Sequence, residues 1–171
     1  IVPEGYEPFV DSLNKMLELS KILRAYKTKR GCIDFNIEEA KIVVNDKGEA
    51  IDVVLRNRGV GEKMIEDFMI AANETVASCV YFMDLPFVYR VHGEPNEEKI
   101  NNFLKFISIL GYKVNGNIKE ITPKEMQKLL GQLSEKKEFS ILSRLLLRSM
   151  QKAVYDKNNI GHFGIASKCY T

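Results

Sequence analysis

Apolar residues recur at helical spacing along much of this chain and predict two long helices in its first half. In residues 7–29 they stand three and four positions apart, and the stretch ends in basic residues followed by Gly31, a common helix stop. Residues 60–83 give the strongest pattern in the chain. Their apolar side chains fall on one side of a long helix: Met64, Ile65, Phe68, Met69, Ala72, Val76, Cys79, Val80 and Met83.

Further helical segments are predicted in the second half. Pro95 opens a helix that carries apolar residues at helical spacing and stops at Gly111. The sequence TPKE at 122–125 is a capping box with proline at the first helical position, so another helix starts there. Residues 138–155 form a last stretch with apolar periodicity.

The other apolar runs predict strands. AKIVV and EAIDVVLR are β-branched runs on either side of the turn NDKG, which indicates a hairpin, and LPFVYRVH at 85–92 is typical of a short buried strand. No repeat, low-complexity tract or flexible linker interrupts the sequence. We therefore expect a helix-rich α+β fold without an internal boundary, in which a β-hairpin and short strands pack against a long central helix.

Composition narrows the class of protein only a little. Hydrophobic residues make up 45% and charged residues 28% of the chain, and a net charge of +2 does not by itself indicate nucleic-acid binding. The cysteines Cys32, Cys79 and Cys169 form no CxxC pair, so they favour a reducing cytoplasmic compartment over a zinc site or a disulfide framework. No apolar run is long enough for a membrane span.

Polar residues of the 60–83 helix fall into two groups. Asp67 and Glu74 lie on the face opposite the apolar stripe, whereas Glu66 and Asn73 line its border. A carboxylate and an amide at the border are either solvated helix-edge groups or groups that point into a cleft. Helical geometry alone favours the solvated edge, because border positions are common and functional ones are few.

An aromatic residue, Phe35, follows the basic pair Lys29 and Arg30 at the entrance to the hairpin. It could stack on a nucleobase while the cations meet phosphates, although a phenylalanine at the start of a strand is more often part of the core. His92 and His162 are far apart and have no helical metal spacing, so a buried structural role is favoured for each.

The acidic residues form no complete catalytic set. Glu38–Glu39, Glu66–Asp67 and Glu97–Glu98 are adjacent pairs, and neighbours on a helix point about 100° apart rather than toward one metal ion. A P-loop, a nucleophile elbow and a GxGxxG motif are also missing. We therefore expect neither a catalytic nor a metal-binding residue within this chain.

Longer segments, taken in order, resemble the catalytic RNB domain of the ribonuclease II/ribonuclease R family, and its bacterial ribonuclease R branch in particular. The resemblance covers about residues 20–171 and is carried by RGCIDF, IEDFMIAAN, YRVHGEPNEEK, and RSM followed by GHFG. It implies that residues 1–171 are a partial RNB domain, the helix-rich part of that fold.

The resemblance implies a parent enzyme that is a cytoplasmic, processive, magnesium-dependent 3′→5′ exoribonuclease, which hydrolyses single-stranded or structured RNA to nucleoside 5′-monophosphates. The family's metal-binding aspartates would precede this chain, and its catalytic arginine would follow Thr171. Its cold-shock and S1-type RNA-binding domains would also lie outside. We therefore expect an internal fragment that is inactive alone, takes RNA as its partner, and has no membrane partner.

Two positions match RNA-binding residues of the family. Phe35 corresponds to an aromatic residue that stacks on a base near the 3′ end, and Glu66 to a carboxylate that holds the terminal nucleotide and favours RNA through its ribose hydroxyl. Arg90 and Arg148 also lie in matched motifs and are further candidate RNA contacts. For Asn73 and His162, a structural hydrogen-bonding role is favoured.

Two other hypotheses stay open. The chain could be a truncated paralogue that binds RNA without cutting it. It could also be a helical protein-interaction module that keeps the fold and has lost RNA binding.

Overall fold

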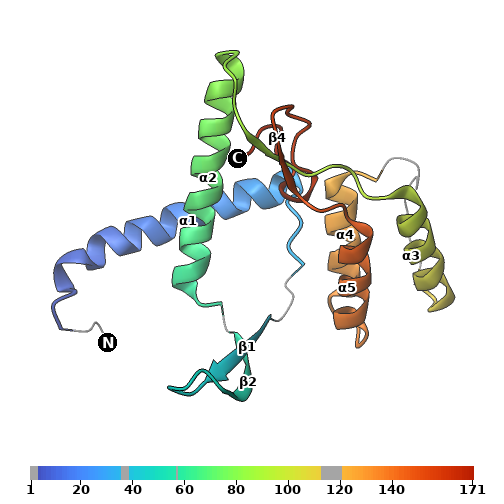
Figure 1. The fold of residues 1–171 in the computed structure, drawn as a ribbon, viewed down its shortest axis with the longest axis horizontal. Helices are drawn as coiled ribbons and strands as arrows, with labels where there is room; N and C mark the ends of the chain where they lie inside the picture. Colours follow the sequence, from blue (N-terminus) through green and yellow to red (C-terminus); the bar gives the residue numbers. More distant parts are fainter. Residues whose placement is uncertain (1–3, 36–38, 57, 113–120) are drawn as a thin grey trace.

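The structure, a computed structural model, describes residues 4–35, 39–56, 58–112 and 121–171. Two long helices, α1 (Val10–Arg30) and α2 (Val60–Phe82), cross each other on one side of the molecule (Figure 1). Three shorter helices gather on the other side: α3 (Glu97–Ile109), α4 (Pro123–Leu133) and α5 (Phe139–Ser149). None of the helices within these ranges combines the length and apolar character needed to cross a membrane.

The described strands form two small antiparallel sheets, β1 (Glu39–Val44) with β2 (Ala50–Arg56), and β3 (Tyr89–Val91) with β4 (Val154–Asp156). Short 3₁₀ turns precede α1 (η1, Glu7–Phe9) and follow β4 (η3, Phe163–Ile165). The mixture of helices with small antiparallel sheets confirms the predicted helix-rich α+β class.

Local sequence signals set most helix ends. The capping box before α4 is present, since Thr122 N–H donates to Glu125 Oε2 at 2.9 Å and Glu125 N–H donates to the Thr122 hydroxyl. Helix α1 stops at Gly31, whose φ of 109° lies in the left-handed region that favours glycine. Helix α3 begins after Asn96, whose side chain accepts from Lys99 N–H, rather than at Pro95.

The 138–155 stretch divides into two elements. Helix α5 ends at Ser149, and the residues that follow cross to the neighbouring segment as β4. There Val154 pairs with Val91 and Asp156 pairs with Tyr89. The predicted strand at 85–92 is therefore real but shorter, and within it Tyr89 and Val91 are buried while Arg90 between them is exposed.

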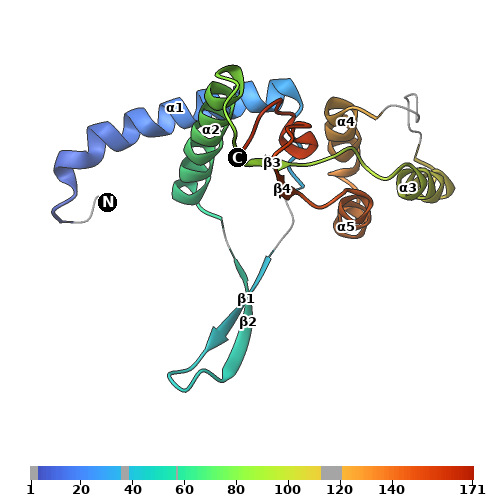
Figure 2. The same cartoon turned by 45° about the horizontal axis from the view of Figure 1, so that its top comes forward.

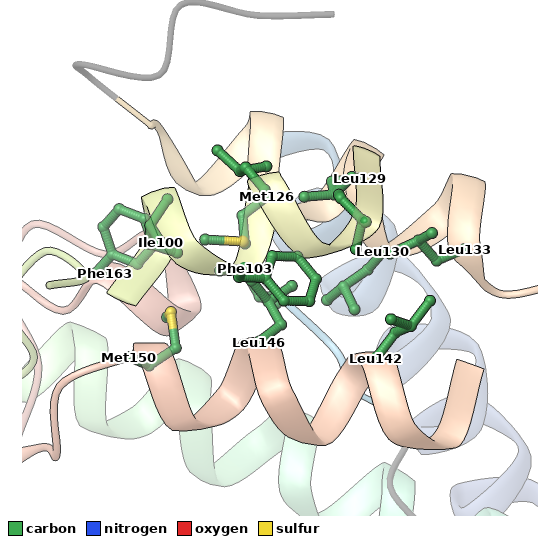
Figure 3. Packing of buried hydrophobic residues seen from close by; sticks show 13 residues of the cluster. Ile100, Phe103, Met126, Leu129, Leu130, Leu133, Leu142, Leu146, Met150 and Phe163 are labelled. Carbon is green, nitrogen blue, oxygen red and sulfur yellow. The ribbon is translucent and has the colours of Figure 1, made fainter. Parts of the chain in front are cut away.

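The main hydrophobic core lies between α3, α4 and α5 (Figure 3). Each helix contributes residues at helical spacing, so their apolar stripes face one another: Ile100, Phe103, Leu104, Ile107, Met126, Leu129, Leu130, Leu133, Leu142 and Leu146. Full burial of one such side chain contributes about 1.5–3 kcal/mol, so this cluster is the main apolar support of the described fold.

The hairpin β1–β2 projects away from the helices (Figures 1 and 2). Its turn is built as predicted, because the Asn45 side chain accepts from Lys47 N–H and Glu49 N–H at 3.0 Å each and Gly48 has a φ of 79°. Ile42 pairs with Val53 on one face of the ribbon, and both side chains are exposed. The hairpin is therefore held by its ladder and turn rather than by packing on α2.

Helix α2 is packed the opposite way from an ordinary amphipathic helix, which buries its apolar stripe. Ile65, Met69 and Val76 of the stripe are 49%, 58% and 49% exposed, whereas Asp67 on the polar face is 3% exposed. The polar face meets α1, so charged groups rather than apolar ones join the two long helices.

Replacing Leu142 by alanine is expected to lower the free energy of unfolding by about 2–5 kcal/mol, because the fully buried side chain leaves a cavity between the three short helices. Ile141→Ala is the matched control, since Ile141, the neighbour of Leu142 on α5, is 62% exposed, and it should change stability by less than about 0.5 kcal/mol. Urea denaturation followed by circular dichroism measures both. Equal losses for the two variants would contradict this placement of the core.

Candidate functional site

One buried carboxylate joins α1 to α2. The Ser20 hydroxyl donates to Asp67 Oδ2 at 2.8 Å, and Arg24 donates to the same oxygen from Nε at 3.1 Å and from Nη2 at 2.7 Å. The ammonium group of Lys27 donates to the other oxygen, Oδ1, at 2.9 Å. Ser20, Arg24 and Lys27 are four and three positions apart, so one face of α1 supplies all of these donors.

These partners decide the charge of Asp67. Burial on its own would raise the pKa of this carboxyl group, but the hydrogen bonds from Lys27, Arg24 and Ser20 outweigh it and hold the pKa below its ordinary value. The group is therefore ionised at neutral pH. It acts as a structural anchor, and its lone pairs are taken by protein donors.

A second ion pair joins the same helices closer to the C-terminal segment. Arg30 at the end of α1 donates to both carboxylate oxygens of Glu74, and its Nη2 also donates to the Ile165 carbonyl at 3.1 Å. One guanidinium thus ties α1, α2 and η3 together. The predicted face that carries Asp67 and Glu74 is consequently an interface between helices.

Glu66, the neighbour of Asp67, lies between a lysine of α1 and an arginine that precedes α2. Lys27 Nζ lies 3.7 Å from its Oε1, and Arg58, in the connection from β2 to α2, forms an ion pair with its Oε2. The Glu66 side chain is 41% exposed, so part of the carboxylate remains open to solvent. Glu66 is therefore a charged acceptor that two cations approach and a ligand can still reach.

Phe35 ends a short segment that is fixed from two sides. Ile33 N–H donates to the Gly164 carbonyl at 2.8 Å, and Gln127 Nε2 donates to the Cys32 carbonyl at 2.9 Å. The ring itself is half-buried and packs against the main core, which agrees with the core interpretation while leaving part of the ring exposed. Phe35 precedes the hairpin and Glu66 follows it along the chain, and no hydrogen bond or ion pair joins the two side chains within the described residues.

The structure brings together the two histidines that the sequence keeps far apart. The rings of His92 and His162 lie 5.0 Å apart between centroids. His92 Nδ1 accepts from Gly164 N–H at 3.0 Å, so its Nε2–H donates to the Gln151 carbonyl at 2.8 Å. A Cβ at Gly164 would stand 2.9 Å from His92 Nδ1, so this close approach requires glycine.

His162 is held neutral in this pair. Burial, the neighbouring His92 and the charge of Arg90 together lower its pKa to about 4. Its ring lies 5.2 Å from that of Tyr170, whose hydroxyl accepts from the Asn73 side chain at 3.2 Å. The Nδ1 atom of His162 is buried and has no hydrogen-bond partner in the described residues. Both histidines line a cleft of about 790 Å³.

The two candidate arginines lie apart from Phe35 and Glu66. Arg90 is exposed on β3, where its N–H donates to the Tyr170 carbonyl at 2.9 Å, and its charge acts on both histidines. Arg148 is exposed in the last turn of α5. Neither forms a hydrogen bond or ion pair with Phe35 or Glu66 in the described ranges, so direct contacts do not join the four predicted residues.

Magnesium is the metal that the resemblance implies, and three carboxylates of α2 do not fit it. Asp67 is saturated by protein donors, Glu74 is paired with Arg30, and Glu66 is approached by two cations. Across the described residues, no three histidine, cysteine, aspartate or glutamate side chains converge as metal ligands.

This chain belongs to the RNB domain family, whose family model matches residues 4–171. Ribonuclease R 1 of Lactococcus lactis is 43% identical over 168 residues, which cover 98% of this chain and 21% of that protein. Ribonuclease R of Thermotoga maritima is 44% identical over 167 residues, covering 97% of this chain and 23% of that protein. The chain therefore spans about a fifth of the length of these relatives.

Solved structures show the same fold. Ribonuclease R of Mycoplasma genitalium, in its apo form, matches with a TM-score of 0.94 and 31% identity over all of this chain and 27% of that one. Structures of the same protein with ribose-methylated single-stranded RNA and with double-stranded RNA match equally well. The family assignment from the sequence motifs is confirmed.

The sequence patterns did not identify several residues that the structure places at the site. Ser20, Arg24 and Lys27 recur on one face of α1, and that spacing was the available signal for a partner carboxylate. The pairing of His92 with His162 has no such signal, because only the parallel bridge between their segments creates it.

Asp67→Asn keeps the shape of the anchor and removes its charge. We expect it to lower the free energy of unfolding by about 3 kcal/mol, because Arg24 and Lys27 lose their shared counter-ion. Asp11→Asn breaks the exposed Lys15–Asp11 pair and serves as the control, with an expected change below about 0.5 kcal/mol. Urea titrations compare the two, and a loss no larger for Asp67→Asn than for Asp11→Asn would refute the anchor.

The neutral His162 predicts a loss of stability in mild acid. The unfolded chain protonates this ring near its ordinary pKa of 6.5, but the folded chain does so only near 4. The free energy of unfolding should therefore fall as the pH drops from 6.5 toward 4, by up to about 1.4 kcal/mol per pH unit for this group.

Urea midpoints between about pH 7.5 and 5 measure the effect above the range in which Asp67 titrates. His162→Gln should flatten the dependence and leave only the smaller contribution of His92, whose pKa burial also lowers. An unchanged slope in this variant would show that His162 is not the group involved.

Proposed function

We propose that this chain is part of a processive 3′→5′ exoribonuclease that requires magnesium and hydrolyses RNA to nucleoside 5′-monophosphates in the cytoplasm. Membership of the RNB family across residues 4–171 carries the proposal. The ribonuclease R structures with single-stranded and double-stranded RNA support RNA as the ligand. The share of the relatives that the chain spans supports its being one segment of a longer enzyme.

Within that enzyme, this chain supplies residues of the RNA channel. The exposed part of the Phe35 ring stacks on a base near the 3′ end, while its fixed segment and the core behind it keep the ring in place. Glu66 accepts a hydrogen bond from the terminal ribose, and the 2′-hydroxyl gives a preference for RNA over DNA. The exposed Arg90 and Arg148 contribute positive charge toward phosphates.

The magnesium ligands and the catalytic residues belong to parts of the enzyme outside this chain. The partners of Glu66, Asp67 and Glu74 on α2 support this division, because each of these three carboxylates is already paired with protein cations. The chain alone is therefore inactive.

A denaturing-gel time course with 5′-labelled single-stranded RNA and magnesium tests the proposal, with this chain run beside a longer form extended in both directions. Stepwise shortening of the RNA from its 3′ end by the longer form alone is the expected result. If neither form cuts RNA and both bind it, the chain belongs to a non-catalytic RNA-binding protein. If neither binds RNA, a protein-interaction module is the better description. Degradation by the short chain would overturn the division of labour.

Phe35→Ala should weaken the affinity for single-stranded RNA by about tenfold, because one stacked base contributes about 1–3 kcal/mol. Phe35→Trp keeps an aromatic face and should retain affinity. Phe82→Ala, which removes an aromatic ring that is 83% exposed on α2, is the control and should have little effect. Fluorescence anisotropy with a labelled RNA measures all three, after circular dichroism has verified the fold. Equal affinities for wild type and Phe35→Ala would rule out the stacking role.

A further inference from the structure

The Glu66 carboxylate is met by two cations that come from different parts of the fold. Lys27 on α1 lies 3.7 Å from Oε1, and Arg58 on the connection from the hairpin to α2 pairs with Oε2. Each oxygen therefore has one cationic neighbour. A carboxylate has about four acceptor positions, and the 41% exposure of this side chain leaves the others accessible.

Lys27 cannot follow Glu66 freely, because it is held by the buried anchor between the long helices. Its Nζ donates to Asp67 Oδ1 at 2.9 Å, and its side chain is only 16% exposed. The position of this charge is thus fixed by the packing of α1 on α2. In such a half-buried place, its attraction for Glu66 is screened less than it would be in open water.

Arg58 approaches from the other side and links Glu66 to the hairpin. It lies just before the first residue of α2 and reaches a carboxylate two turns into that helix. With its side chain 39% exposed, it is more accessible than Lys27. A planar guanidinium restricts the orientation of a carboxylate more than a single ammonium group does.

From this arrangement we infer that Arg58 and Lys27 are positioning residues for Glu66. They keep its carboxylate in one orientation, with the open acceptor positions turned outward to the ribose hydroxyl. The inference rests on the proposed role of Glu66 in holding the terminal nucleotide. It assigns to Arg58 an effect on the recognition of the sugar rather than a direct contact with RNA phosphate.

A double-mutant cycle in the full-length protein tests the inference, with Arg58→Gln, Glu66→Gln and the double variant. The probe is a single-stranded RNA and the same RNA with a 2′-deoxy sugar at its 3′ terminus, bound in the presence of EDTA so that no cleavage occurs. The measured quantity is the ratio of the two affinities, which reports on the ribose hydroxyl and cancels contacts to phosphate.

Arg58→Gln should reduce this ratio by about fivefold. On a logarithmic scale this is half or more of the effect that Glu66→Gln has. In the double variant, Arg58→Gln should not reduce the ratio beyond the effect of Glu66→Gln alone. Arg58→Lys keeps the charge but not the planar guanidinium, so it should restore the ratio only in part. Lys15→Gln, which breaks the exposed pair with Asp11, is the matched control and should leave the ratio unchanged. Lys27→Gln should also lower the ratio. Because this substitution also weakens the packing of α1 on α2, the double-mutant cycle uses Arg58 instead.

The outcomes separate the two proposals. If Glu66→Gln lowers the ratio and Arg58→Gln does not, the positioning role is wrong while the role of Glu66 stands. If Arg58→Gln weakens binding of both RNAs equally and adds to Glu66→Gln, Arg58 contacts phosphate directly, and the inference is again wrong. If Glu66→Gln leaves the ratio unchanged, the proposed role of Glu66 fails, and the positioning role fails with it.

Discussion

The arrangement of the long helices depends on one buried carboxylate, Asp67. Burying such a charge costs several kcal/mol unless donors meet it, and α1 supplies these donors from a single face. Because the hydrogen bonds from these donors must all converge on the two oxygens of one side chain, they fix the point at which α1 crosses α2. Apolar packing alone would tolerate a shift along the helices more readily, because it has no directional requirement.

This polar crossing also explains the outward apolar stripe of α2. With the Asp67 face against α1, helical geometry turns Ile65 and Met69 away from it, where the described residues leave them largely uncovered. The hairpin shows the same feature at Ile42 and Val53. Exposed apolar surface on this scale is typical of regions that contact other protein, and the chain spans only about a fifth of its ribonuclease R relatives.

The features that sequence predicted well are local. The capping box at Thr122, the stop at Gly31 and the turn at Asn45 each depend on residues within a few positions of one another. The packing direction of α2 was not predictable in this way, because hydrophobic periodicity gives the stripe but not its partner. The contact between His92 and His162 is likewise non-local, since it exists only after two distant segments pair.

The candidate site shows why family motifs were needed beside residue patterns. Glu66 and Asp67 are adjacent carboxylates with identical chemistry, yet a helix turns them about 100° apart, so one enters the crossing and the other borders solvent. Lys27 contacts both of them. Lys27, which pairs with the buried Asp67, therefore also holds one side of the Glu66 carboxylate. The geometry at Glu66 thus depends directly on how α1 packs on α2. Spacing alone could not distinguish these two roles, because their difference arises from the partners on α1.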